Sequence, residues 1–149
     1  MLSENENPCH ATCVAFNGDG VLICGKPGAG KSDLALRLME KGFDLVADDA
    51  VLLNVADGVL RAAPPDALAG MIEVRGVGVV TAPFVRDVAV KLKIVLSCGE
   101  KIDRMPESKV EDVRGVAVPC VVLNGFESSA AAKALCALNI ATGRQKRVE

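Results

Sequence analysis

The sequence predicts one α/β domain whose β-sheet mixes parallel and antiparallel strands. Three observations support this prediction: the chain has 149 residues and is 50% hydrophobic, short apolar runs alternate with helical patterns, and a glycine-rich stretch joins one such run to a helix. This length suits one domain, and the composition suffices for one buried core. We expect a flexible segment at residues 1–8, the single domain at 9–143 and a frayed tail at 144–149.

The first two elements are predicted to form an antiparallel hairpin. Residues 11–16 and 21–24 are apolar, and residues 17–20 between them read Asn-Gly-Asp-Gly. Asn-Gly and Asp-Gly supply the positive φ angles that tight hairpin turns need. Because a hairpin comes first, we expect antiparallel or mixed pairing instead of the all-parallel sheet of ordinary doubly wound folds.

The second strand leads into a candidate phosphate-binding loop. The stretch follows the pattern G-x-x-x-x-G-K-[ST] and consists of Gly25, Lys26, Pro27, Gly28, Ala29, Gly30, Lys31 and Ser32. Glycines let backbone N–H groups approach phosphate oxygens, and the helix that begins near Lys31 turns its positive end toward them. Lys31 is expected to reach the β- and γ-phosphates, and the Ser32 hydroxyl is expected to ligate Mg²⁺.

The remaining elements are predicted from apolar periodicity and turn residues. A helix is expected over 31–41, ending at Gly42. It is followed by a strand at 44–53, a turn at 56–58, a strand at 59–61 and a short helix at 66–69. Strands are then expected at 71–80, 87–98 and 116–123, with a surface loop at 99–109. The last element is an alanine-rich helix that Ser128 or Ser129 caps and that ends at about Asn139.

Asp48 and Asp49 interrupt the apolar run 44–53. They follow the helix of the phosphate-binding loop, where proteins with such loops place a carboxylate for Mg²⁺ or its waters. Side chains alternate along a strand, so the two point to opposite faces unless the strand ends there. One would hold the metal network while the other accepts a proton from an attacking hydroxyl. Two solvated aspartates at a turn are the alternative.

Three further charged residues are candidates for the site. Glu73 and Arg75 share one face of the predicted strand 71–80, and a metal and a phosphate would satisfy their charges. A cross-strand ion pair is the alternative for these two. His10 is the only histidine. An imidazole there can carry positive charge beside a phosphate, and a structural or solvated histidine is the alternative.

Composition argues against two classes of partner. The net charge is −2 and the only aromatic residues are four Phe, so we expect no nucleic-acid partner. Residues 1–8 are polar and acidic, and no apolar run approaches the length that spans a bilayer. We therefore expect no membrane partner and a cytoplasmic location.

Five elements in the same order resemble the catalytic domain of the HPr kinase/phosphorylase family. They are His10, fifteen residues before the loop, then the loop at 25–32, the strand at 45–49, the segment 62–65, and residues 72–79, which resemble the family signature Glu-Ile-Arg-Gly-Leu-Gly. The resemblance implies a P-loop kinase domain related in fold to phosphoenolpyruvate carboxykinase, with a mixed β-sheet and flanking helices.

The resemblance also implies an activity. It implies a serine protein kinase that uses ATP and Mg²⁺ to phosphorylate HPr, the small phosphocarrier of the sugar phosphotransferase system. Family members form hexamers, so we expect a homo-oligomer, with a hexamer as one form that the resemblance implies.

By position, the resemblance assigns roles to individual residues. Lys31 is catalytic, and Ser32 and Glu73 are Mg²⁺ ligands. Asp49 accepts the proton of the serine hydroxyl with Asp48 beside it, and His10 is an active-site residue near phosphate. Arg75 lies in the segment 72–81, which resembles the family stretch needed for both directions of the reaction.

Two features differ from full-length family members. The chain is about as long as the catalytic half alone, so it resembles the truncated homologues of some Gram-negative bacteria and suggests a regulatory role. The nearest counterpart of the family segment Pro-Val-Arg-Pro-Gly-Arg is 118–125, which has no arginine, and this disfavours the reverse phosphorylase activity. A small-molecule kinase on the same scaffold and a non-catalytic ATP-sensing module are the alternative functions.

Overall fold

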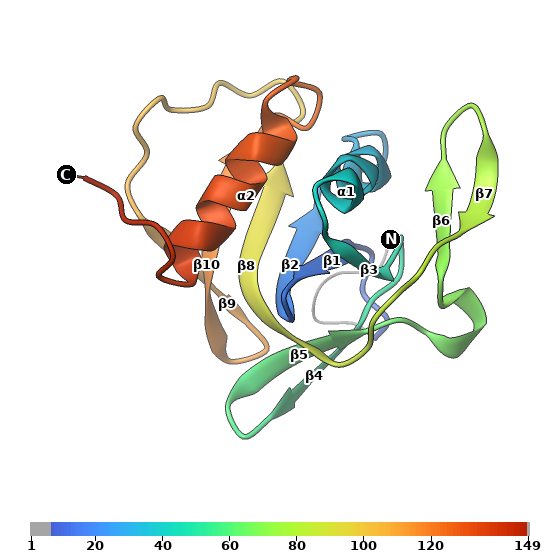
Figure 1. Cartoon of the computed structure of the whole chain (residues 1–149). Helices are drawn as coiled ribbons and strands as arrows, with labels where there is room; N and C mark the ends of the chain where they lie inside the picture. Colours follow the sequence, from blue (N-terminus) through green and yellow to red (C-terminus); the bar gives the residue numbers. More distant parts are fainter. Residues whose placement is uncertain (1–6, 149) are drawn as a thin grey trace.

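The computed structural model describes residues 7–148, which form a mixed β-sheet with two helices on one face (Figure 1). The strands of the main sheet are β1 (Thr12–Phe16), β2 (Asp19–Cys24), β3 (Asp44–Ala47), β4 (Leu52–Ala56), β5 (Val59–Ala63), β8 (Val88–Leu96), β9 (Lys109–Val113) and β10 (Val116–Leu123). A separate hairpin consists of β6 (Met71–Val74) and β7 (Gly78–Thr81). The helices are α1 (Lys31–Glu40), α2 (Ala130–Ala141) and the short 3-10 helix η1 (Asp66–Leu68).

The main sheet runs in the order β3-β1-β2-β8-β10-β9. β8 pairs in parallel with both β2 and β10, whereas β1 pairs antiparallel with β2 and β3, and β9 pairs antiparallel with β10. The β4–β5 hairpin joins through an antiparallel contact between β5 and the start of β8. The predicted mixed pairing is therefore confirmed, and the carboxyl ends of β2, β8 and β10 lie along one edge.

Hydrophobic residues fill both faces of the sheet. On one face, α1 and α2 bury Leu34, Leu38 and Leu138 against strand residues that include Ile23 and Ile94. On the other face, Leu53, Leu60 and other residues of the β4–β5 hairpin cover side chains of β1, β2 and β8. Because both faces are covered, the central strands are apolar on both sides.

The first hairpin confirms its predicted turn. Asn17 and Gly18 have φ angles of 51° and 83°, the left-handed pair that a two-residue hairpin turn requires. The expected four-residue turn is too long, because Phe16 already pairs with Asp19 and β2 starts there. Gly20 lies inside β2, where a Cβ atom would come within 2.9 Å of the Val88 side chain.

Two predicted strands are wrong in extent. The run 44–53 contains β3 and β4 separated by a bend, because Asp49 adopts a φ of 68° that a continuous strand does not allow. The run 71–80 is the β6–β7 hairpin, which reverses at Gly76 with a φ of 87°. In both cases the apolar pattern continues across a reversal of the backbone.

Two smaller expectations near the C-terminal half are also wrong. β9 begins at Lys109, the last residue of the predicted loop, and continues over residues for which the sequence predicts no strand, because they are mostly exposed and charged at the edge of the sheet. Ser129 precedes α2 as predicted, but its side chain makes no capping hydrogen bond. The helix also extends to Ala141, beyond the expected end at Asn139.

The termini are described in part. Of the segment expected to be flexible, residues 1–6 lie outside the described residues, and the Asn7 side chain exchanges two hydrogen bonds with the backbone of Leu53. In the tail expected to fray, Arg144 contacts Asp19 at 2.8 Å and Arg147 donates to the Pro106 carbonyl at 2.7 Å. Glu149 lies outside the described residues.

A search of residues 7–148 for a helix both long and apolar enough to cross a bilayer finds none.

A partly buried ion pair ties β8 to the edge strand β9. Lys93 is 6% exposed, and its Nζ lies 2.8 Å from Glu111 Oε1, while Lys109 approaches the other carboxylate oxygen at 3.2 Å. The hydrogen bond from Lys93, aided by Lys109, lowers the pKa of Glu111. A group whose pKa falls on folding stabilises the protein above its unfolded pKa, and this contribution is lost as the pH falls through the folded pKa.

We predict that Glu111→Gln lowers the free energy of unfolding at pH 7 by about 2 kcal/mol, because the buried Lys93 ammonium loses its charged acceptor. Urea unfolding at pH 7 and at a pH below about 4.5 measures this. The variant should lose less stability on acidification than the unmodified chain. An equal acid sensitivity of both proteins would contradict this account of Glu111, and Asp112→Asn on the same strand is the control.

Candidate active site

A pocket of about 450 Å³ contains the predicted site residues. Its wall combines the end of the loop after β2, the bend after β3, the β6–β7 hairpin and the loop after β10. The predicted residues that line it include His10, Lys31, Asp48, Asp49, Glu73 and Arg75. The fold therefore brings together segments that are more than 60 residues apart in sequence.

The glycine-rich loop has the backbone of a phosphate cradle. Gly28 and Gly30 have φ angles of 85° and 97°, which favour glycine, and the Ala29 N–H donates to the Lys26 carbonyl at 3.0 Å. The space beside the Gly28 Cα is open. α1 begins at Lys31, within the last two residues of the loop, so its unpaired N–H groups turn toward the pocket.

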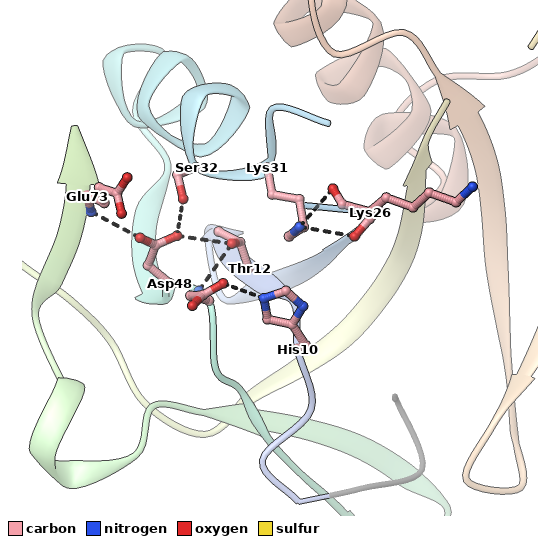
Figure 2. A network of polar contacts seen from close by, with 9 residues as sticks. His10, Thr12, Lys26, Lys31, Ser32, Asp48 and Glu73 are labelled. Carbon is pink, nitrogen blue, oxygen red and sulfur yellow. Dashed lines mark hydrogen bonds and ion pairs between the residues drawn. The ribbon is translucent and has the colours of Figure 1, made fainter. Parts of the chain in front are cut away.

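Lys31 is held inside this loop. Its side chain is 7% exposed, and its Nζ donates to the carbonyls of Gly25 at 3.0 Å and Lys26 at 3.3 Å (Figure 2). An ammonium group has three donors. Two of them are occupied, so one remains to reach an anion in the pocket.

The other predicted loop residues divide into two groups. Pro27, Gly28, Gly30 and Ser32 line the pocket, as Lys31 does. Gly25 and Lys26 contribute their carbonyls to Lys31, and the Lys26 side chain points away from the other labelled residues (Figure 2). Ala29 is buried. The loop therefore offers the pocket its backbone groups, the Lys31 ammonium and the Ser32 hydroxyl, whereas Lys26 does not line the pocket.

Asp48 is the centre of the polar network. Its Oδ1 accepts hydrogen bonds from Ser32 Oγ at 2.6 Å and Thr12 Oγ1 at 3.0 Å, and its Oδ2 accepts from the Glu73 N–H at 3.0 Å (Figure 2). The residue is 9% exposed. A buried carboxylate requires such donors. Asp48 thereby joins α1, β1 and β6.

Asp49 has a different environment. Its side chain is 69% exposed, and its Oδ1 lies 2.6 Å from His10 Nε2. Its backbone N–H donates to Thr12 Oγ1 at 3.3 Å. The expectation that Asp48 and Asp49 point to opposite faces applies only to a continuing strand. Here β3 ends at Ala47, and both side chains line the same pocket.

His10 connects Asp49 to the segment before β1. Its Nδ1 atom is buried and has no hydrogen-bond partner among the described residues. The other ring nitrogen faces Asp49. A histidine with one nitrogen on a carboxylate is fixed in orientation, so His10 is not a freely solvated residue.

Glu73 and Arg75 both line the pocket, but they do not share a strand face. β6 ends at Val74, so Glu73 lies on the strand and Arg75 in the turn that follows. Both side chains are exposed, and within residues 7–148 no ion pair joins them. Their charges therefore face the pocket without neutralising each other directly.

Thr12 and Phe126 are among the site residues that are missing from the sequence-based prediction. Thr12 is fully buried on β1 and contacts both aspartates. A polar residue in an apolar strand was the available signal, but only the pairing of β1 with β3 shows which partners it meets. Phe126 reaches the pocket from the loop after β10, and no local pattern connects it to Gly30.

The donor set fits a phosphate with Mg²⁺. Among residues 7–148, no cluster of three or more His, Cys, Asp or Glu side chains is placed to hold a metal alone. Mg²⁺ is usually bound through one or two carboxylates together with substrate phosphates and waters. The oxygen donors of Ser32, Asp48 and Glu73 beside the cradle match that chemistry.

Comparisons with known sequences find one family. The family model described as HPr Serine kinase C-terminal domain matches residues 2–127 of this chain. The HPr kinase/phosphorylase of Clostridium novyi (strain NT) is 47% identical over 78 residues, which are 52% of this chain and 25% of that protein. The HPr kinase/phosphorylase of Peptoclostridium acidaminophilum is 37% identical over 120 residues, 77% of this chain and 39% of that protein.

A solved structure agrees over almost the whole chain. The Hpr(Ser) kinase/phosphatase from Coxiella burnetii matches with a TM-score of 0.78 and 26% identity, covering 93% of this chain and 97% of that chain. By contrast, the matched region spans only about a quarter to two fifths of the two sequence relatives.

We predict that Thr12→Val lowers the free energy of unfolding by about 1–2 kcal/mol, whereas Thr12→Ser has a smaller effect. Valine keeps the shape but leaves Asp48 with one donor fewer and the Asp49 N–H without its acceptor. Chemical denaturation measures the difference. Equal stability of the valine and serine variants would show that the hydroxyl contributes nothing to the network.

Proposed function

The chain belongs to the HPr serine kinase C-terminal domain family, and on this premise we propose that it is an ATP- and Mg²⁺-dependent serine kinase that phosphorylates HPr. The acceptor is proposed from the names of the relatives, which act on HPr. One observation carries the proposal. The candidate phosphate cradle with Lys31 and the exposed, His10-bound Asp49 face the same pocket.

The nucleotide is held by the loop in this mechanism. The N–H groups at the start of α1 and the remaining donor of Lys31 bind the β- and γ-phosphates of ATP. Ser32 and Glu73 would hold Mg²⁺, which would neutralise phosphate charge. Asp48 orients both ligands, because it accepts from the Ser32 hydroxyl and from the backbone N–H of Glu73.

Asp49 is the proton acceptor. The serine hydroxyl of HPr attacks the γ-phosphorus, its proton passes to Asp49, and the bond to the β,γ-bridging oxygen breaks to release ADP. Asp48 is less suited to this step, because three donors occupy its oxygens and it is buried. Asp49 is exposed, and its contact with His10 fixes the carboxylate toward the pocket.

The proposal covers the forward reaction only. Residues 118–125 contain no arginine. This segment therefore lacks the arginines that its counterpart in the HPr kinase/phosphorylase family uses for the reverse reaction. The structure carries Asn124 and Gly125 there, followed by Phe126.

The direct test is transfer of labelled γ-phosphate from Mg-ATP to purified HPr. We expect label on one HPr serine, located by mass spectrometry, and none with Lys31→Ala. Label on a small molecule instead would favour a small-molecule kinase. ATP binding without any transfer would overturn the kinase proposal in favour of an ATP-sensing module.

We predict that Asp49→Asn lowers the transfer rate by about 10²- to 10⁴-fold, the usual contribution of a general base. ATP affinity should change little, because Asp49 is not placed in the phosphate cradle. Transfer kinetics and equilibrium ATP binding are measured on the same preparation.

The control for this prediction is Asp103→Asn, in an exposed loop outside the pocket. Transfer at the unmodified rate by Asp49→Asn would rule out this role for Asp49. Loss of transfer in the Asp103 variant as well would show that the effect is not specific.

A further inference from the structure

Phe126 is an exposed aromatic residue at the pocket. Its relative exposure is 66%, and it lines the same cavity as Lys31 and Ser32. The other three phenylalanines have partners: Phe16 and Phe43 lie 5.0 Å apart between ring centroids, and the Arg86 guanidinium lies 5.2 Å from the Phe84 ring. An aromatic ring left open to solvent at a polar pocket has no stabilising role in the core.

The loop that carries Phe126 is fixed to the helix of the phosphate cradle. Arg37 of α1 donates from Nη1 to the Glu127 carbonyl at 3.0 Å and from Nη2 to the Gly125 carbonyl. These two carbonyls flank Phe126 in sequence. The Phe126 N–H donates to Asn124 Oδ1 at 3.0 Å. The backbone on both sides of the ring is therefore held in place.

The same loop also lies directly against the glycine-rich loop. A Cβ atom on Gly125 would stand 2.9 Å from the Ala29 carbonyl oxygen, and a Cβ on Gly30 would stand 3.2 Å from a carbon of the Phe126 ring. Glycine at these two positions permits the close approach. The ring is thus next to the cradle, lines the pocket and is mostly exposed to solvent.

The sheet topology places this ring where a ligand is expected to extend. β2, β8 and β10 are parallel, and ligands of such sheets bind outside the carboxyl ends of the strands. The cradle follows β2, and Phe126 follows β10. A nucleotide with its phosphates in the cradle can therefore extend along this edge toward the ring.

We propose that Phe126 is the platform on which the base of the bound nucleotide stacks. This proposal rests on the ATP binding proposed above, and it adds a binding site for the base, which the phosphate-binding loop does not contact. Aromatic side chains bind bases through stacking of the two π-faces. The phosphates contribute affinity through Lys31 and the backbone. Phe126 makes the affinity for a nucleoside triphosphate higher than that for a polyphosphate without a base.

The test compares equilibrium binding of Mg-ATP with that of Mg-tripolyphosphate, which has no base. Phe126→Leu should weaken ATP binding roughly tenfold and leave tripolyphosphate binding within about twofold. Phe126→Trp should retain ATP affinity. The chain contains no Trp or Tyr, so the introduced indole reports directly: ATP should quench its fluorescence and tripolyphosphate should not.

Met105→Ala, which removes another exposed apolar side chain, is the matched control. Unfolding curves should show that all variants are folded, since Phe126 is mostly exposed. If Phe126→Leu weakens the binding of both ligands equally, or of neither, the stacking role of Phe126 is wrong, even when HPr is phosphorylated normally. If the unmodified chain binds neither ligand, the proposed function itself fails.

Discussion

The site depends on one buried carboxylate. Asp48 is almost inaccessible, so its charge is tolerable only while three donors from three separate elements remain on it. This requirement fixes the start of α1, the first residue of β1 and the backbone of β6 relative to one another. Positioning of the Ser32 hydroxyl and of the Glu73 backbone follows from the same constraint.

The sheet gives this network its surroundings. The opening hairpin places β1 and β2 together, and the parallel pairs of β2 with β8 and of β8 with β10 collect three loops at one edge. The two neighbouring aspartates then differ in character for a structural reason. Asp48 is still covered by the sheet and the helix, whereas the left-handed bend at Asp49 turns that residue toward solvent and His10. Asp48 joins the elements of the site, and Asp49 is the aspartate that is open to solvent.

Much of the fold and site follows from local sequence. The turn at Asn17 and Gly18, the glycine-rich loop, the stop of α1 just before Gly42 and the mixed sheet are confirmed, and the family resemblance agrees with the match over residues 2–127. The failures have a common cause. The runs 44–53 and 71–80 are apolar on both sides of their charged residues, and periodicity does not show a reversal inside such a run.

The sequence by itself determined which chemical groups are present, because backbone conformation at glycines and the pattern of the loop are local properties. Only the tertiary structure decided which of these groups contact one another. Thr12 meets Asp48 through the pairing of β1 with β3, and Phe126 meets Gly30 across almost a hundred residues of chain. Such contacts depend on strand order and register, which arise from packing of the whole sheet and leave no signal in the residues nearby.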